Sequence, residues 1–70
     1  MCIEARIAQS KQDKALNLLA AHLNVRLLWR THGDYDLHLI AFYAKGKEGR
    51  TIQGLTALLE KLNATNISGP

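Results

Sequence analysis

Hydrophobic and polar side chains alternate strictly at the start of the chain. Ile3 and Ala5 fall on one side, and Glu4 and Arg6 fall on the other. A period of two is typical of a strand with one buried face. We therefore predict a strand over residues 1–8.

After this strand the hydrophobic residues recur every three or four positions. Leu16 and Leu19 follow this spacing, which is typical of an amphipathic helix. Ser10 and Asp13 form a start signal, because their side-chain oxygens can accept hydrogen bonds from free N–H groups of the first turn. We expect the helix to end at Asn24, since Asn tolerates the left-handed conformation that terminates helices.

Residues 25–31 return to a period of two. Leu27 and Trp29 belong to an apolar set, and Leu28 belongs to a set that also contains arginines. We predict a second strand here. We expect Leu28 to lie on the sheet face that the helices do not cover.

Residues 37–44 are the most apolar segment, and both of their alternating sets are rich in hydrophobic side chains. A strand of this kind has both faces covered. A chain of 70 residues buries only a thin core, and its single cysteine, Cys2, cannot form an internal disulfide. We therefore predict that a second copy covers the face opposite the helices.

The last third of the chain repeats the order of helix and strand. A polar loop at 45–49 precedes Ile52, Leu55 and Leu59, which have helical spacing. Asn63 can end that helix, and residues 64–68 read as a short final strand.

Two strand-and-helix units of this kind predict a ferredoxin-like βαββαβ sandwich. In this α+β fold, a four-stranded antiparallel sheet carries two helices on one face. We assign residues 1–70 to one such domain.

Charge and composition exclude several classes of protein. Nine Lys and Arg against six Asp and Glu give a net charge of +3, which does not require a nucleic-acid partner. The longest apolar run, residues 39–44, is far shorter than the roughly 18 residues of a membrane span. A lone thiol without a signal sequence fits a cytoplasmic protein. We expect neither direct nucleic-acid binding nor membrane contact.

Catalytic motifs are missing as well. The sequence has no phosphate-binding Gly-rich loop and no nucleophile elbow. Asp34 and Asp36 are a close pair of carboxylates, but Asp beside Gly33 usually serves the turn itself. We expect a non-enzymatic domain without a cofactor.

The turn between the second and third strands reads His32-Gly33-Asp34-Tyr35-Asp36. This segment resembles the Thr-Gly-Asp-Tyr-Asp turn in the regulatory domain of Lrp/AsnC-type transcription regulators. The order and lengths of the elements resemble that domain over the whole chain.

The resemblance implies a domain that pairs through its sheets, forms homodimers and higher oligomers, and binds an amino acid or related effector beside this turn. Stand-alone versions lack the helix-turn-helix, and this chain looks like one. It would then act in transcription regulation with a DNA-binding Lrp-type protein. Nearby Arg30 could pair a ligand carboxylate. The ligand-binding residues expected are Arg30, His32, Gly33, Asp34, Tyr35 and Asp36.

A metal-sensing domain is one alternative. His32, His38 and Cys2 are possible ligands, although they lack the spacing of a metal motif. The segment Ile52-Gln53-x-Leu55 also looks like a helix of nickel-responsive regulators, without their clustered histidines. The predicted site therefore contains no metal.

An RNA-binding module is another alternative, because its strands follow the same order. Trp29, Phe42 and Tyr43 are aromatic residues of the predicted strands, and we expect them beside Arg26 and Arg30 in the sheet. The third strand lacks the aromatic signature of that module.

Overall fold

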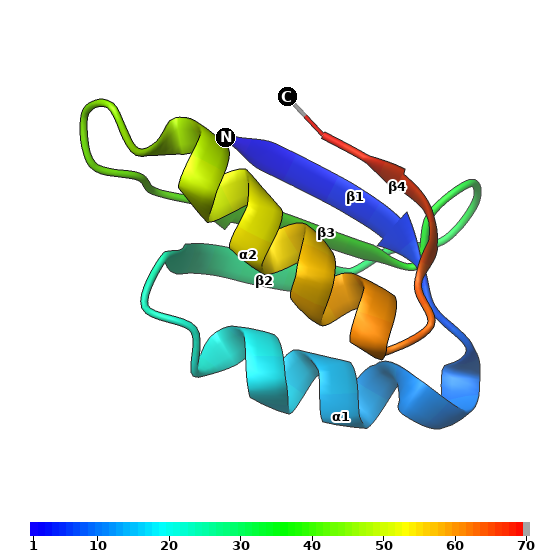
Figure 1. Ribbon diagram of the computed structural model, residues 1–70. Helices are drawn as coiled ribbons and strands as arrows, with labels where there is room; N and C mark the ends of the chain where they lie inside the picture. Colours follow the sequence, from blue (N-terminus) through cyan, green and yellow to red (C-terminus); the bar gives the residue numbers. More distant parts are fainter. Residues whose placement is uncertain (70) are drawn as a thin grey trace.

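The structure is a computed structural model that describes residues 1–69. Its elements are β1 (Cys2–Arg6), α1 (Gln9–Ala20), β2 (Val25–Arg30), β3 (Leu37–Ala41), α2 (Glu48–Lys61) and β4 (Thr65–Ser68). The strands form one antiparallel sheet in the order β2-β3-β1-β4, and both helices lie on one side of it (Figure 1). The predicted ferredoxin-like α+β arrangement is confirmed.

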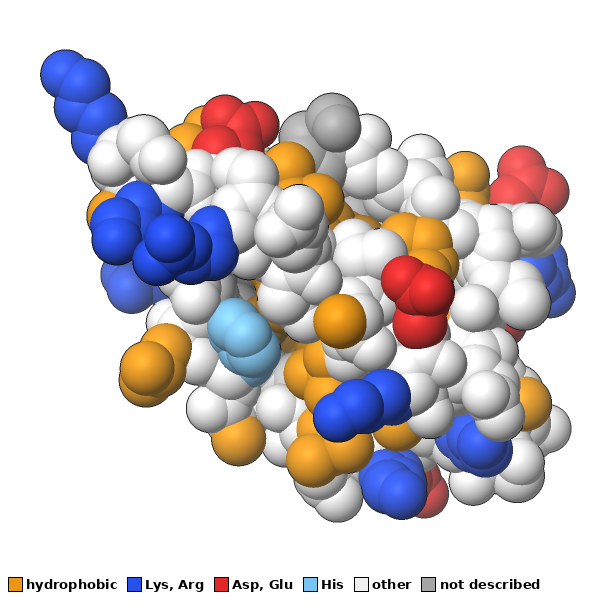
Figure 2. Space-filling view, in the orientation of Figure 1, with side chains coloured by type: hydrophobic (Ala, Val, Ile, Leu, Met, Phe, Trp, Pro, Cys, Tyr) orange, Lys and Arg blue, Asp and Glu red, His pale blue; other side chains and the backbone are white. Residues whose placement is uncertain are grey.

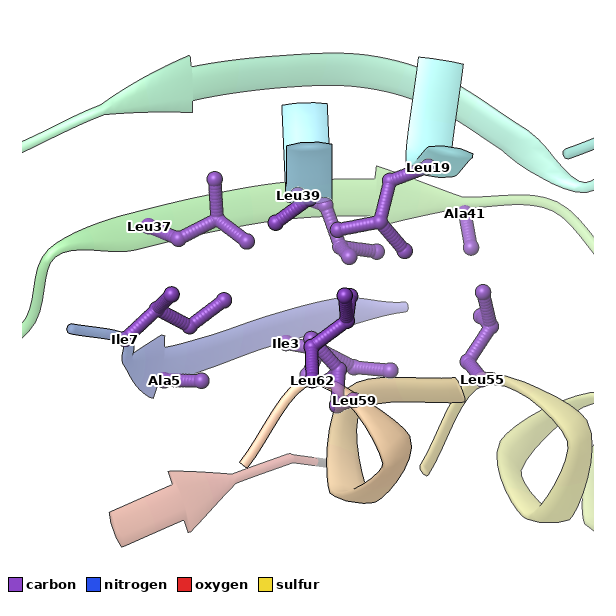
Figure 3. Packing of buried hydrophobic residues seen from close by; sticks show 11 residues of the cluster. Ile3, Ala5, Ile7, Leu19, Leu37, Leu39, Ala41, Leu55, Leu59 and Leu62 are labelled. Carbon is purple, nitrogen blue, oxygen red and sulfur yellow. The ribbon is translucent and has the colours of Figure 1, made fainter. Parts of the chain in front are cut away.

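The hydrophobic core lies between the helices and the sheet (Figure 3). Alternate residues of the central strands point into it, such as Ile3 from β1 and Leu39 from β3, while α1 contributes Leu19 and α2 contributes Leu55 and Leu59. The buried set is Ile3, Ala5, Ile7, Ala15, Leu19, Leu37, Leu39, Ala41, Leu55, Leu59 and Leu62. The alternation read from the sequence therefore identifies the covered side of β1.

The predicted start of the first helix is wrong. α1 begins at Gln9 with Ala8 as its N-cap, and no side chain caps it. Ser10 lies inside the first turn, and Asp13 forms an ion pair with Arg30 instead. The chain enters the helix two residues before the signal because Ala8 already accepts the first helical hydrogen bond, from Lys11.

The two predicted helix ends differ in outcome. Asn63 has a φ of 58° directly after the C-cap of α2, as its left-handed tolerance predicts. Asn24 does not end α1, which stops at Ala20. The Asn24 amide nitrogen instead donates to the Phe42 carbonyl at 2.8 Å and ties two loops together.

β3 is shorter than predicted and ends at Ala41. Val25, the first residue of β2, pairs with Ala41, so no strand partner on that side continues beyond it. Residues 42–44 therefore leave the sheet, and Phe42 is bonded through its N–H to the carbonyl of Asn24 at 2.7 Å.

The side assigned to Leu28 is also wrong. A bulge between Val25 and Leu27 shifts the register of β2 against β3. Leu28 then lies opposite the buried Leu39 and packs on the core, while Leu27 and Trp29 are 56% and 40% exposed on the other side. The extra residue of a bulge reverses the alternation, which a simple period of two does not anticipate.

Figure 2 shows the helix side of the molecule, where Lys and Arg side chains gather near the start of α2. Lys45, Lys47 and Arg50 belong to this region, and all three are exposed. Within residues 1–69, neither helix is long and apolar enough to cross a membrane.

Candidate functional site

A cleft of about 780 Å³ opens where β1 runs into α1 and β2 runs into the turn at 31–36. In Figure 1 this is the end of the sheet that carries the arrowhead of β1. The lining residues are Arg6, Ile7, Ala8, Gln9, Gln12, Arg30, Thr31, His32, Asp36, Asn63 and Thr65. Three segments that are distant in sequence, residues 6–12, 30–36 and 63–65, thus surround one polar cavity.

The turn is held in place by Arg6, the last residue of β1. Its Nη1 donates to the carbonyls of Gly33 and Asp34, both at 2.9 Å. Gly33 has a φ of 102°, a backbone conformation that residues other than glycine rarely adopt. The Thr31 hydroxyl donates to the carbonyl of Tyr35 at 2.8 Å and closes the turn from inside.

Asp36 fastens the far end of the turn to β1. Its carboxylate accepts a hydrogen bond from the N–H of Ile7 at 3.0 Å, and its own N–H donates to the carbonyl of Ala5 at 3.0 Å. The Arg6 Nε lies 3.8 Å from the same carboxylate. Asp36 therefore shapes the cleft and places one negative charge on its wall.

Arg30 contributes an exposed guanidinium to the cleft. It pairs with Asp13 of α1, but the two side chains are 51% and 90% exposed. Exposed ion pairs of this kind contribute little stability, because solvent screens them. Asp13 therefore holds the Arg30 guanidinium only weakly.

The first turn of α1 also favours an anion at this cleft. Its early N–H groups have no side-chain cap, and the turn contains no acidic residue. Gln9, the first helical residue, lines the cleft. Free N–H groups and the positive end of the helix dipole attract negative charge.

Three of the six predicted ligand-binding residues meet at the cleft, namely Arg30, His32 and Asp36. Gly33 and Asp34 do not line it, and their carbonyls bind Arg6. These two residues form the turn rather than the wall of the cavity.

Tyr35 points to a different surface. Its ring meets the His38 ring edge-on, with centroids 6.0 Å apart and planes at 82°. His38 lies on the side of the sheet that the helices leave uncovered.

Arg6 and Gln12 also belong to the cleft, although the sequence pattern does not identify them as site residues. The alternation of β1 placed Arg6 on a polar face without indicating a partner 27 residues away. Gln12 donates from Nε2 to the carbonyl of Ile7 at 3.1 Å, a contact that depends on how the chain turns into α1. Only the strand order brings these side chains to the turn.

The other face of the sheet carries a second group of side chains. We call it the open face, and its residues are Cys2, Glu4, Leu27, Trp29, His38 and Ile40. The His38 Nε2 lies 3.3 Å from the Glu4 Oε2, and the Trp29 ring lies 5.5 Å from the His38 ring. This face therefore mixes apolar side chains with a thiol, a carboxylate and an imidazole.

The residues of the two alternative functions separate in space. Cys2 and His38 lie together on the open face, but His32 lines the cleft. Among the aromatic residues, Trp29 lies on the open face. Phe42 lies past the end of β3, and the Arg26 guanidinium stacks over its ring at 5.0 Å from the ring centroid.

No protein-family model, curated protein or solved structure matches this chain.

Proposed function

We propose that this domain binds a small zwitterionic effector of the amino-acid class in the cleft and pairs with a second copy through its open face. A role in transcription regulation, with a DNA-binding Lrp-type partner, follows from the resemblance of its turn to Lrp/AsnC regulatory domains. The observation that carries the proposal is the convergence of Arg30, His32 and Asp36 on one cavity.

The two ends of a zwitterion have matching groups in the cleft. Its carboxylate would bind the Arg30 guanidinium and the uncapped N–H groups at the start of α1. Its ammonium would bind the Asp36 carboxylate on the wall. Cavities of roughly 300–1,000 Å³ hold small ligands, so the volume suits this class.

Pairing is supported by the chemistry of the open face. Leu27, Trp29 and Ile40 place an apolar group on neighbouring strands, and Leu27 is more than half exposed. A small domain gains much of its stability from association, because its own core is thin. Two copies facing each other would cover the same apolar group on both.

Isothermal titration calorimetry against the standard amino acids tests the effector. We expect binding for at least one of them, and Arg30→Gln should weaken it by about 10- to 150-fold, since hydrogen bonds to charged groups contribute roughly 1.5–3 kcal/mol. Arg50→Gln is the matched control, because this exposed arginine on α2 does not line the cleft.

Two results would contradict the effector assignment. One is the absence of heat with every amino acid. The other is binding that Arg30→Gln leaves unchanged, which would place the ligand outside the cleft.

A further inference from the structure

Three side chains of the types that bind metal ions meet on the open face. Cys2 and Glu4 are alternate residues of β1 and share this face, and His38 lies directly opposite Glu4 in β3. A thiol sulfur, a carboxylate oxygen and an imidazole nitrogen here lie within 4.8 Å of one another. The register of two central strands brings three different ligand types to one point.

We propose that Cys2, Glu4 and His38 form a binding site for a divalent transition-metal ion, with Zn²⁺ as the best match. Zn²⁺ takes Cys, His and Glu ligands, and three protein ligands leave one position for water. Ca²⁺ and Mg²⁺ prefer oxygen ligands only, so the sulfur and nitrogen disfavour them.

The spacing already approaches that of a tetrahedral site. Zn²⁺ bond lengths place a nitrogen ligand and an oxygen ligand about 3.4 Å apart, and sulfur and nitrogen about 3.6 Å apart. The His38 Nε2 and the Glu4 Oε2 are 3.3 Å apart. Cys2 is exposed, so its side chain can rotate toward the other two without disturbing the core.

Aromatic neighbours hold the imidazole in position. The Trp29 ring lies 5.5 Å from the His38 ring at a tilt of 38°, and the Tyr35 ring meets it edge-on. A ligand whose ring is already oriented loses less conformational entropy when it binds the ion. Tyr35 does not line the cleft, but its ring helps to orient the His38 imidazole.

The metal site is independent of the proposed effector. None of its three ligands lines the cleft, and His32 is outside the cluster. It lies on the face through which we propose pairing, with the chain's single tryptophan beside it.

Titration of the reduced chain with Co²⁺, followed by absorption spectroscopy, tests this site. We expect one ion per chain, the visible bands of a four-coordinate cobalt ion and a near-ultraviolet charge-transfer band from the Cys2 thiolate. Zn²⁺ should displace the cobalt and remove both signals. Cys2→Ser should abolish the charge-transfer band.

Separate variants test the other two ligands. His38→Gln and Glu4→Gln should each weaken Co²⁺ binding by more than the roughly 10- to 100-fold that loss of an outer-shell contact produces. His32→Gln and His22→Gln are matched controls and should bind as the unmodified chain does. Circular dichroism identifies any variant that fails to fold.

Three results would overturn the metal site. These are a missing charge-transfer band in the unmodified chain, unchanged affinity in folded His38→Gln and Glu4→Gln, or a loss of binding in His32→Gln equal to that in His38→Gln. Calorimetry with amino acids in the presence of a chelator tests the cleft separately, so either assignment can fail alone.

Discussion

The two faces of the sheet are built from the same strands and differ in almost every chemical property. On the covered face, Ile3 and Leu39 are at most 2% exposed. On the open face, Glu4 and His38 form a polar contact beside Leu27, which is 56% exposed. One face holds the fold together, and the other has side chains suited to recognition. Substitutions on the two faces should therefore affect different measurements.

The largest expected effect is on folding, from Leu39→Ala on the covered face. Leu39 is fully buried, so its truncation should lower the free energy of unfolding by about 2–5 kcal/mol. Leu27→Ala on the open face should change it by about 0.5 kcal/mol or less in the monomer. Urea denaturation at low protein concentration measures both. Equal losses would mean that the faces do not differ as described.

The next effect concerns association. Leu27→Glu should weaken pairing by at least about tenfold, because two copies would bring like charges into one apolar contact. Leu18→Glu is the matched control, since Leu18 is 41% exposed on α1, outside the open face. Sedimentation equilibrium measures both constants. A greater loss in the Leu18 variant would move the interface to the helix side.

A smaller effect is expected at Asp36, which joins the turn to β1. Asp36→Asn removes the charge that Ile7 and Arg6 contact, and should lower stability by about 1 kcal/mol. Asp34→Asn should have little effect, because Asp34 contributes its backbone carbonyl to Arg6. Thermal unfolding of the two variants shows whether stability depends on the Asp36 carboxylate or only on the backbone of the turn. Similar losses in both would contradict the role given to the Asp36 carboxylate.

The smallest effect lies past the end of β3. The negative charge of Glu48 raises the pKa of the Tyr43 hydroxyl above its usual value of 10.0. Because the folded chain holds this proton more tightly, the stabilisation is present below pH 10 and is lost as the pH rises through the raised pKa. Ultraviolet titration of Glu48→Gln should show Tyr43 ionising at a lower pH. An unchanged titration would mean that Glu48 does not raise the pKa of Tyr43.

Much of the fold follows from local patterns in the sequence. The alternation of Ile3 and Ala5 predicts the covered side of β1, and Asn63 marks the end of α2. Such patterns fail where a neighbouring strand decides the outcome. The bulge in β2 exchanges the sides of Leu27 and Leu28, and β3 ends where its pairing with β2 ends.

The candidate site could be predicted only in part for the same reason. Arg30, His32 and Asp36 lie in or beside a turn that its composition identifies. Arg6 joins them through the strand order, and the contact of Glu4 with His38 depends on the register of β1 against β3. Predicting contacts between distant segments requires the strand order and register in addition to the local sequence pattern.

The most direct test of the difference between the two faces is the fluorescence of Trp29, the only tryptophan, during dilution through the micromolar range. Trp29 is 40% exposed in the single chain. If the open face pairs two copies, dilution with a chelator present should shift its emission to longer wavelength as dimers seen by sedimentation dissociate. A chain that stays monomeric, or dimers that dissociate without any change in this emission, would contradict the account.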